Sequence, residues 1–164
     1  MGSFTHLDEK GGVRMVDVGQ KPPTDRRAVA QAVVVMQADT FQRITDRTIK
    51  KGNVLETARI AGVMAAKKTA ELIPMCHPLN LRHVQVDFFP EADTHRIRIE
   101  AAVRVIDQTG VEMEALTAAA VAALTIYDMC KSYDRGMAIV DTWLLKKSGG
   151  KSGDFTRESV EGVS

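Results

Sequence analysis

Alternation of apolar and polar residues marks two strands in the middle of the chain. The pattern runs over residues 83–89 and again over 96–106, on either side of a Pro-Glu-Ala-Asp turn at 90–93. A period of two is typical of strands that bury one face, so these segments predict an antiparallel hairpin. Further strands are expected over residues 13–18, over 26–36, where the composition also fits a helix but β-branched residues favour a strand, and over 138–145.

Capping patterns and helix-forming composition predict two long helices. Asn53 is followed three residues later by a glutamate, which is typical of a capping box, and a helix is expected over residues 54–72, before a proline. Thr109 and Glu112 repeat this spacing at the start of an Ala- and Leu-rich helix over residues 111–132. A shorter helix is expected over residues 41–48.

One face of the first long helix carries only small side chains, which lets another backbone approach closely. We expect this strip to pack on the sheet or on a partner helix. Its members are Ala58, Gly62, Ala65, Ala66 and Thr69.

The order of these elements indicates an α+β fold in which helices cover one face of an antiparallel sheet. A chain of 164 residues with 45% hydrophobic content can bury one core, so a single domain is expected. Residues 13–145 would form its core. Residues 1–12 are expected to be a mobile arm, and residues 146–164, rich in Gly, Ser and Lys, a flexible loop and tail.

The balance of charge argues against two classes of partner. Lys and Arg number 22 and Asp and Glu 21, for a net charge of +1, and only 5% of residues are aromatic. Because nucleic-acid binding uses a cationic field or stacking platforms, we expect neither nucleic acid nor an anionic membrane as a partner. No uninterrupted apolar run approaches the roughly 20 residues that span a bilayer.

Compartment and redox state follow from the N-terminus and the cysteines. The chain begins without the apolar segment of a secretion signal, so a cytoplasmic protein is expected. Its two cysteines, Cys76 and Cys130, are then expected to be free thiols with packing roles.

The second long helix carries charged residues at both ends of one otherwise apolar face. Helical spacing aligns Glu114 near its start with Asp128 and Lys131 near its end. Asp128 and Lys131 are three residues apart, so they form either an ordinary surface pair or an acid/base couple at the edge of a pocket.

The length of this helix constrains any site that uses both ends. Seventeen residues separate Glu114 from Lys131, which corresponds to about 26 Å along the axis. One small-molecule site cannot span that distance within one chain. We therefore expect an oligomer in which one end of this helix meets the other end of a neighbour's helix.

Residues 74–78, Pro-Met-Cys-His-Pro, form a rigid connector that holds His77 in place. His77 is either a buried structural histidine or a site residue. Cys76 and His77 are adjacent instead of spaced as metal ligands usually are, and no second Cys/His pair stands in register, so no metal site is expected.

Two lysine-containing segments bear on phosphate binding. Residues 149–152, Gly-Gly-Lys-Ser, lack the first glycine of a Walker loop because position 145 is Leu145, so the segment is either a lid that closes on phosphates or a disordered tail. Lys50 and Lys51 precede the Asn53 cap, where a cation is unfavourable unless an anion binds as well. This weakly favours a phosphate-bearing ligand.

Several blocks of the chain, spread from residue 15 to residue 155, resemble the cyclic pyranopterin monophosphate synthases of molybdenum-cofactor biosynthesis. The blocks are residues 15–18 (Met-Val-Asp-Val), 51–52 (Lys-Gly), 57–62 (Thr-Ala-Arg-Ile-Ala-Gly), 72–79 (Leu-Ile-Pro-Met-Cys-His-Pro-Leu), 109–117 (Thr-Gly-Val-Glu-Met-Glu-Ala-Leu-Thr), 127–131 (Tyr-Asp-Met-Cys-Lys) and 147–153 (Lys-Ser-Gly-Gly-Lys-Ser-Gly). The family pattern usually has Asp at Asn53 and Leu at Met75. Both exchanges keep size and capping ability.

The resemblance implies a ferredoxin-like α+β subunit that assembles as a homohexamer, a trimer of dimers, with active sites at subunit interfaces. It implies a lyase that converts 3′,8-cyclo-7,8-dihydro-GTP, made by a preceding radical enzyme, to cyclic pyranopterin monophosphate and pyrophosphate. No cofactor is implied, although Mg²⁺ could accompany the triphosphate.

The resemblance also implies roles for individual residues. Asp128 and Lys131 would be the acid/base pair, assisted by Lys51, and a lysine needs a lowered pKa to donate protons near neutral pH. Substrate-binding positions would be Met75, Cys76, His77, Met113 and Glu114, with Lys21, Arg26 and Lys147 on the triphosphate and Glu112 in base recognition.

Two other functions compete with this interpretation. A metabolite-binding regulatory module is one, since ferredoxin-like folds often serve that purpose. A nucleic-acid-binding protein is the other, and the balanced charge disfavours it. Retention of Asp128, Lys131, Lys51 and His77 together favours the enzyme.

Overall fold

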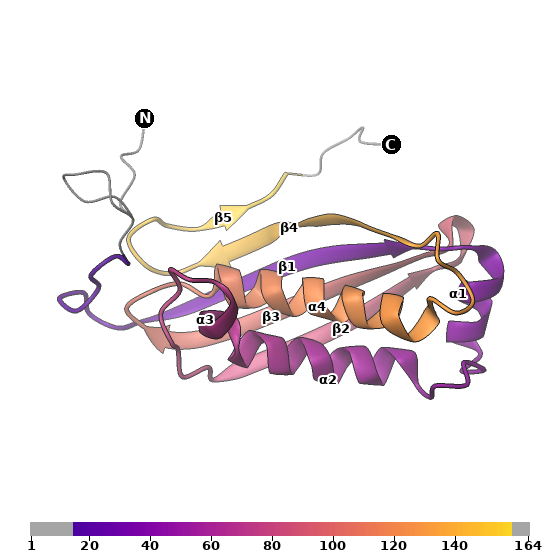
Figure 1. The fold of residues 1–164 in the computed structure, drawn as a ribbon. Coiled ribbons are helices and arrows are strands. Elements are labelled where there is room, and N and C mark those ends of the chain that lie inside the picture. Colours follow the sequence, from indigo (N-terminus) through magenta and orange to yellow (C-terminus); the bar gives the residue numbers. More distant parts are fainter. Residues whose placement is uncertain (1–14, 159–164) are drawn as a thin grey trace, which may run out of the picture.

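The computed structural model describes residues 15–158. Five strands, four α-helices and a short 3₁₀ turn follow one another along this part of the chain (Figure 1). In order they are β1 (Thr24–Val35), α1 (Ala38–Thr45), α2 (Val54–Lys67), α3 (Thr69–Leu72), β2 (His83–Glu91), η1 (Ala92–Thr94), β3 (Arg96–Asp107), α4 (Glu112–Cys130), β4 (Ala138–Ser148) and β5 (Phe155–Thr156).

The strands form one antiparallel sheet in the order β2-β3-β1-β4-β5. Its centre is β1, which pairs with β3 on one side and with β4 on the other. The helical connections α2 and α4 join β1 to β2 and β3 to β4. This βαββαβ arrangement is ferredoxin-like, so the α+β expectation and the hairpin of β2 and β3 are confirmed.

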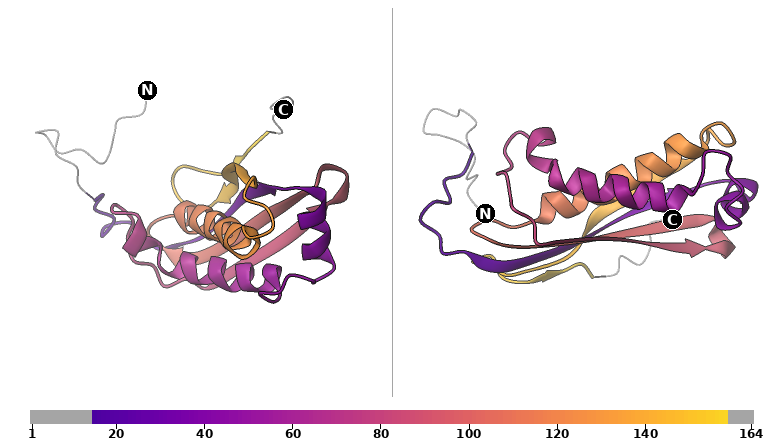
Figure 2. Two further views of the ribbon diagram at one scale, coloured as in Figure 1. Left: turned by 45° about the vertical axis from the view of Figure 1, so that its right-hand side comes forward. Right: turned by 90° about the horizontal axis from the view of Figure 1, so that it is seen from below.

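Both long helices lie on one face of the sheet (Figure 2). The core between the layers consists largely of small residues of α4, such as Ala118 and Ala122, and of β-branched residues of β3, such as Ile97 and Ile99. Among the described helices, α4 is long and apolar enough to cross a membrane, with a mean hydropathy of 1.3. Because α4 packs on α2, β1 and β3, its apolar composition is explained by burial in this core.

The strip of small side chains on α2 was expected to pack on the sheet or on a partner helix. In the structure α2 packs mainly against the helix α4. At the centre of the strip is Gly62, where an added Cβ would lie 3.0 Å from the Ala118 carbonyl oxygen and 3.1 Å from Val86 Cγ2. A methyl group here would make unusually tight contacts, so α4 or β2 would have to move by a few tenths of an ångström to admit it.

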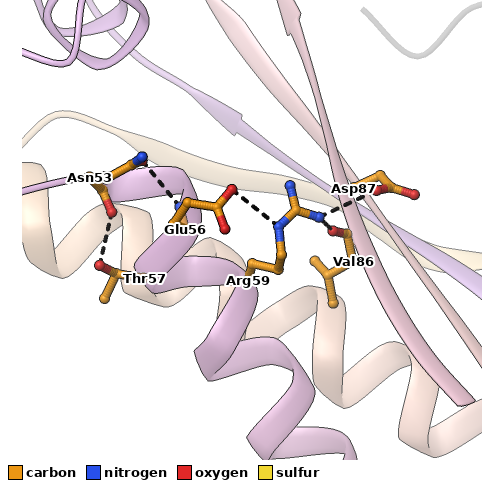
Figure 3. A network of polar contacts seen from close by, with 6 residues as sticks. All are labelled: Asn53, Glu56, Thr57, Arg59, Val86 and Asp87. Atoms are coloured by element: carbon orange, nitrogen blue, oxygen red, sulfur yellow. Dashed lines mark hydrogen bonds and ion pairs between the residues drawn. The ribbon is translucent and has the colours of Figure 1, made fainter.

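A polar network ties the start of α2 to the edge strand β2 (Figure 3). The Asn53 side chain accepts a hydrogen bond from the Glu56 backbone N–H at 3.2 Å, which caps the helix as predicted. Arg59 pairs with Glu56 and with Asp87 and donates to the Val86 carbonyl oxygen. The network fixes the amino end of α2, directly after Lys51.

Three sequence expectations about element bounds are wrong. A strand was expected over residues 13–18, but its described part, residues 15–18, is not a strand. The two strands that pair with β1 are β3 and β4. The helix expected to end at residue 72 breaks at Lys68, because the Thr69 hydroxyl donates to the carbonyl oxygens of Ala65 and Ala66. Thr109 does not cap α4, whose N-cap residue is Val111 without a side-chain bond.

The C-terminal segment contains more strand than expected. A loop and tail were predicted from residue 146, but β4 continues to Ser148 and β5 pairs with its end. The chain reverses at Gly149 and Gly150, whose φ angles of +90° and +82° favour glycine. The arm expected over residues 1–12 and the last part of the tail, residues 159–164, lie outside the described residues.

We predict that Gly62→Val lowers the free energy of unfolding by about 2 kcal/mol, because the added atoms overpack the contact between α2, α4 and β2. Ala61→Val is the matched control, since it places a valine at the next position of the helix, which is half-buried. It is expected to cost only about 0.5 kcal/mol through helix propensity. Denaturant unfolding measures both, and equal midpoints for the two variants would contradict the close contact.

Candidate active site

The charged and polar residues singled out in the sequence lie in two clusters, one at each end of α4. The amino end of α4 lies beside α3 and the connector that follows it, and its carboxyl end lies toward α1 (Figure 1). At the rise of an α-helix, Glu114 and Lys131 are about 26 Å apart.

The cluster at the carboxyl end joins Asp128, Lys131 and Lys51. Lys131 Nζ lies 2.7 Å from Asp128 Oδ1, and Lys51 Nζ donates to the Asp128 backbone carbonyl oxygen at 2.9 Å. The Lys131 and Asp128 side chains are 52% and 65% exposed. The packing of α2 on α4 brings the Lys51 loop to this point.

Charge in this cluster favours the ionised forms. The hydrogen bond from Lys131 lowers the pKa of Asp128 below its usual value, and the Lys51 cation adds to this effect. The same hydrogen bond raises the pKa of Lys131. The expectation of a lowered lysine pKa is therefore not met at Lys131 in the free subunit, because water solvates the pair and Asp128 is its nearest charge.

Lys51 also has a different electrostatic partner from the one expected. The sequence placed its cation near the positive start of α2, where an anion would be needed. The structure places its amine on a carbonyl at the end of α4, where the helix dipole favours a cation. The lysine is thus stabilised without a bound phosphate.

A pocket of about 540 Å³ opens at the amino end of α4. The sequence identified seven of the residues that line it, namely Lys21, Met75, Cys76, His77, Glu112, Met113 and Glu114. Those it missed are Val16, Val18, Ile73, Leu79, Thr109 and Gly110, and the first four add apolar side chains to the wall. Residues 15–18, expected as a strand, contribute to this wall instead.

Two groups in this pocket wall have perturbed acidity. Glu114 is only 4% exposed, and the pKa of its carboxyl is raised to about 7. Burial is the main cause, a backbone hydrogen bond opposes the shift, and the nearby Glu112 carboxylate adds to it. Burial, and then Glu114, raise the pKa of the Cys76 thiol. Burial likewise raises the pKa of Cys130 to about 11, so both cysteines are free thiols and neither is a thiolate near neutral pH.

Lys147 and Arg26 connect this pocket to the end of the sheet. Lys147 Nζ lies 3.1 Å from Glu112 Oε1, an ion pair that sequence spacing could not reveal. Arg26 donates from Nε to the Asp107 carbonyl oxygen at 3.0 Å and from Nη2 to that of Gln108 at 2.9 Å. Its guanidinium therefore fixes the turn that leads from β3 into the pocket.

The subunit thus brings together every expected substrate-binding residue at or beside one pocket and the three expected catalytic residues at the other end of α4. It does not bring the two groups together. Within residues 15–158, no three His, Cys, Asp or Glu side chains are grouped so that they could hold a metal ion.

Comparison with known proteins gives a consistent family match. The sequence model of the MoaC family matches residues 15–150. The chain is 65% identical over 158 residues to the cyclic pyranopterin monophosphate synthase of Desulfatibacillum aliphaticivorans, covering 96% of this chain and 99% of that protein. It is 66% identical over 155 residues to the synthase of Desulforapulum autotrophicum, covering 94% and 95%, and 52% identical over 160 residues to that of Staphylococcus carnosus, covering 97% and 99%.

We predict that Glu114→Gln stabilises the protein in a pH-dependent manner. Because the pKa of Glu114 rises from 4.5 to about 7 on folding, the folded state binds more protons between these values, and wild-type stability falls as pH rises through them. The variant should gain up to about 3 kcal/mol over wild type near pH 8 and almost nothing near pH 4. Denaturant unfolding at both pH values checks this, with the exposed Glu71→Gln as control. An equal gain at both values would contradict the raised pKa.

Proposed function

The chain belongs to the MoaC family, and we propose that Asp128, Lys131 and Lys51 perform the proton transfers of its reaction. Its activity is that of a cyclic pyranopterin monophosphate synthase, a lyase of molybdenum-cofactor biosynthesis. The observation that carries this conclusion is the similarity to named synthases over nearly the full length of both chains.

The proposed substrate is 3′,8-cyclo-7,8-dihydro-GTP. Its purine-derived ring must open and close again, which needs protons moved to and from ring nitrogens. A sugar hydroxyl must attack the α-phosphate while pyrophosphate leaves, and cations that stabilise the phosphate charge contribute most to such a step. The two clusters on α4 supply these two kinds of group.

The contact between Asp128 and Lys131 supports an acid/base role for the pair. Asp128 is held ionised and can accept a proton, and the Lys131 ammonium can donate one. Lys51 is held against the same helix end and adds a second donor. When a substrate covers this exposed cluster, loss of water lowers the pKa of a lysine toward neutral pH.

The pocket at the amino end suits the two parts of the substrate. Met75, Cys76, His77, Met113 and Glu114 form a wall for the ring system, and Glu112 can accept hydrogen bonds from the base. Lys21 lines this pocket and Lys147 pairs with Glu112 of its wall, so both can serve as cations for the triphosphate. Arg26 would act mainly through the turn it fixes, and its Nη1 lies beside Gly150.

The complete site would be assembled from two subunits. One subunit's Asp128 would meet a neighbour's Glu114 end, since α4 is too long to use both ends at once. Exposed apolar side chains on the outer surface of the helix layer support a subunit contact there, with Ile60 61%, Met64 53% and Leu124 56% exposed. By family resemblance the assembly would be a hexamer in the cytoplasm.

The activity is tested by incubating the purified protein with enzymatically prepared 3′,8-cyclo-7,8-dihydro-GTP. Mass spectrometry is expected to detect cyclic pyranopterin monophosphate and pyrophosphate in equal amounts. Binding without turnover would support a regulatory module instead.

We predict that Asp128→Ala and Lys131→Ala each reduce kcat by at least about 100-fold, the usual contribution of general acid/base catalysis, without changing the oligomer. Asp39→Ala is the matched control, because Asp39 and Arg43 form a comparable exposed pair at 2.7 Å on α1. Turnover and light scattering measure the effects. Wild-type rates in either α4 variant would remove the acid/base role.

We also predict that two inactive variants complement each other when mixed. Asp128→Ala disables one cluster and His77→Ala the other, so a mixed oligomer can contain a site in which both clusters are intact. Unfolding and refolding the two together should restore about a quarter of the wild-type rate if subunits pair at random across a two-fold interface. Absence of any recovery, with mixed oligomers shown by native mass spectrometry, would place the whole site in one chain.

A further inference from the structure

The C-terminal strand β5 is too short to hold itself on the sheet. It pairs with β4 at two positions, with Thr156 opposite Lys146 and Phe155 opposite Lys147. Both β5 residues are exposed. A two-residue ladder with little buried surface contributes little stability, so another contact must hold this segment in place.

Arg157 provides that contact. Its backbone N–H donates to the Leu145 carbonyl oxygen at 2.7 Å, and its side-chain Nε donates to the Leu144 carbonyl oxygen at 3.3 Å. Its guanidinium also lies 4.7 Å from the centre of the Trp143 ring, a cation–π distance. Among residues 151–158, Arg157 alone is half-buried and the others are exposed.

An irregularity in β4 between Leu144 and Lys146 places Trp143 and Lys147 on opposite faces of the sheet. The pairing with β1 shifts by one residue between Trp143 and Val140, at Asp141 with φ +52°, and shifts again between Leu144 and Lys146. Trp143 is thereby opposite Gln31, on the face away from the helices, where Arg157 covers it. Lys147 is opposite the buried Ala28 and reaches α4.

The loop between β4 and β5 makes contact with the Lys147 amine. Lys147 Nζ donates to Ser152 Oγ at 2.7 Å while it pairs with Glu112. Gly149 N–H donates to Asp154 Oδ1 at 3.3 Å across the base of the loop. If β5 left the sheet, Ser152 would move away from the amine.

We propose that Arg157 is a positioning residue that clamps β5 on β4 and, through the loop of residues 148–154, sets the position of the Lys147 amine at the pocket. The proposal rests on the phosphate-binding role proposed above for Lys147. Arg157 itself touches neither the pocket wall nor the α4 clusters in the described contacts.

Arg157→Gln tests this in the full-length protein. The KM for 3′,8-cyclo-7,8-dihydro-GTP is expected to rise about fivefold, from loss of a cation–π contact and a hydrogen bond, while kcat stays within about twofold. Amide hydrogen exchange over residues 147–154 should become faster. Arg98→Gln is the matched control, since Arg98 of β3 stacks on Phe89 of the edge strand β2 at 4.2 Å, far from β4 and β5, and the KM of this variant should not change.

A double-mutant cycle separates positioning from general destabilisation. If Arg157 acts through Lys147, then Arg157→Gln should not raise KM further in a Lys147→Ala background. The same fivefold rise in both backgrounds, or an unchanged KM in the single variant, would overturn the proposal. Arg157→Lys should rescue KM only in part, because the lysine ammonium lacks the planar guanidinium that stacks on Trp143 and donates to Leu144.

The experiments distinguish failure of the proposed activity from failure of the Arg157 clamp. If wild-type protein makes no product, the function proposed above fails, and the clamp is then decided by hydrogen exchange and by fluorescence. Trp143 is the one tryptophan of the chain, so tryptophan emission reports on the surroundings of the ring that Arg157 covers. Unchanged exchange over residues 147–154 together with unchanged emission in Arg157→Gln would overturn the clamp without reference to turnover.

Discussion

Close packing of α4 against α2 and against the sheet is the constraint on which the rest of the structure depends. The buried face of α4 consists mainly of alanines, so its backbone lies near those of its neighbours, and a Cβ added at Gly62 of α2 would lie only 3.0 Å from the Ala118 carbonyl oxygen. This contact fixes the two helices relative to each other. The loop before α2 then carries Lys51 to the end of α4, and the short connector after α3 carries His77 to its start.

A rigid helix with chemistry at both ends explains why the isolated subunit looks incomplete. The amino end offers a partly apolar pocket with a buried carboxyl, and the carboxyl end offers an exposed acid and two cations. In the proposed function the first arrangement binds the substrate and the second moves its protons. Because a helix cannot shorten, the two parts can meet only when one subunit lies against another, and this is the physical basis of the proposed shared site.

Sequence patterns predicted the elements better than their ends. Alternation located β2 and β3, and helical spacing located the Gly62 strip, because both patterns reflect burial. Thr109 was misjudged as a cap because Glu112, its expected partner, instead pairs with Lys147, which is distant in sequence. The contacts of Lys51 were equally invisible, since its carbonyl partner belongs to another helix. The residues of the pocket were named through family resemblance, but the apolar wall from Val16 and Val18 follows from tertiary structure alone.

The acidity of Lys131 shows how assembly and chemistry would depend on each other. In the free subunit the pair with Asp128 is exposed, and Lys131 holds its proton more tightly than an ordinary lysine. A proton donor near neutral pH needs the opposite shift, which burial and neighbouring cations produce. In the proposed assembly a second subunit would remove water from this helix end and bring the Lys21 and Lys147 cations toward it. The contact that completes the proposed site would therefore also make its lysine a better acid, so that catalysis would depend on the oligomer for two separate physical reasons.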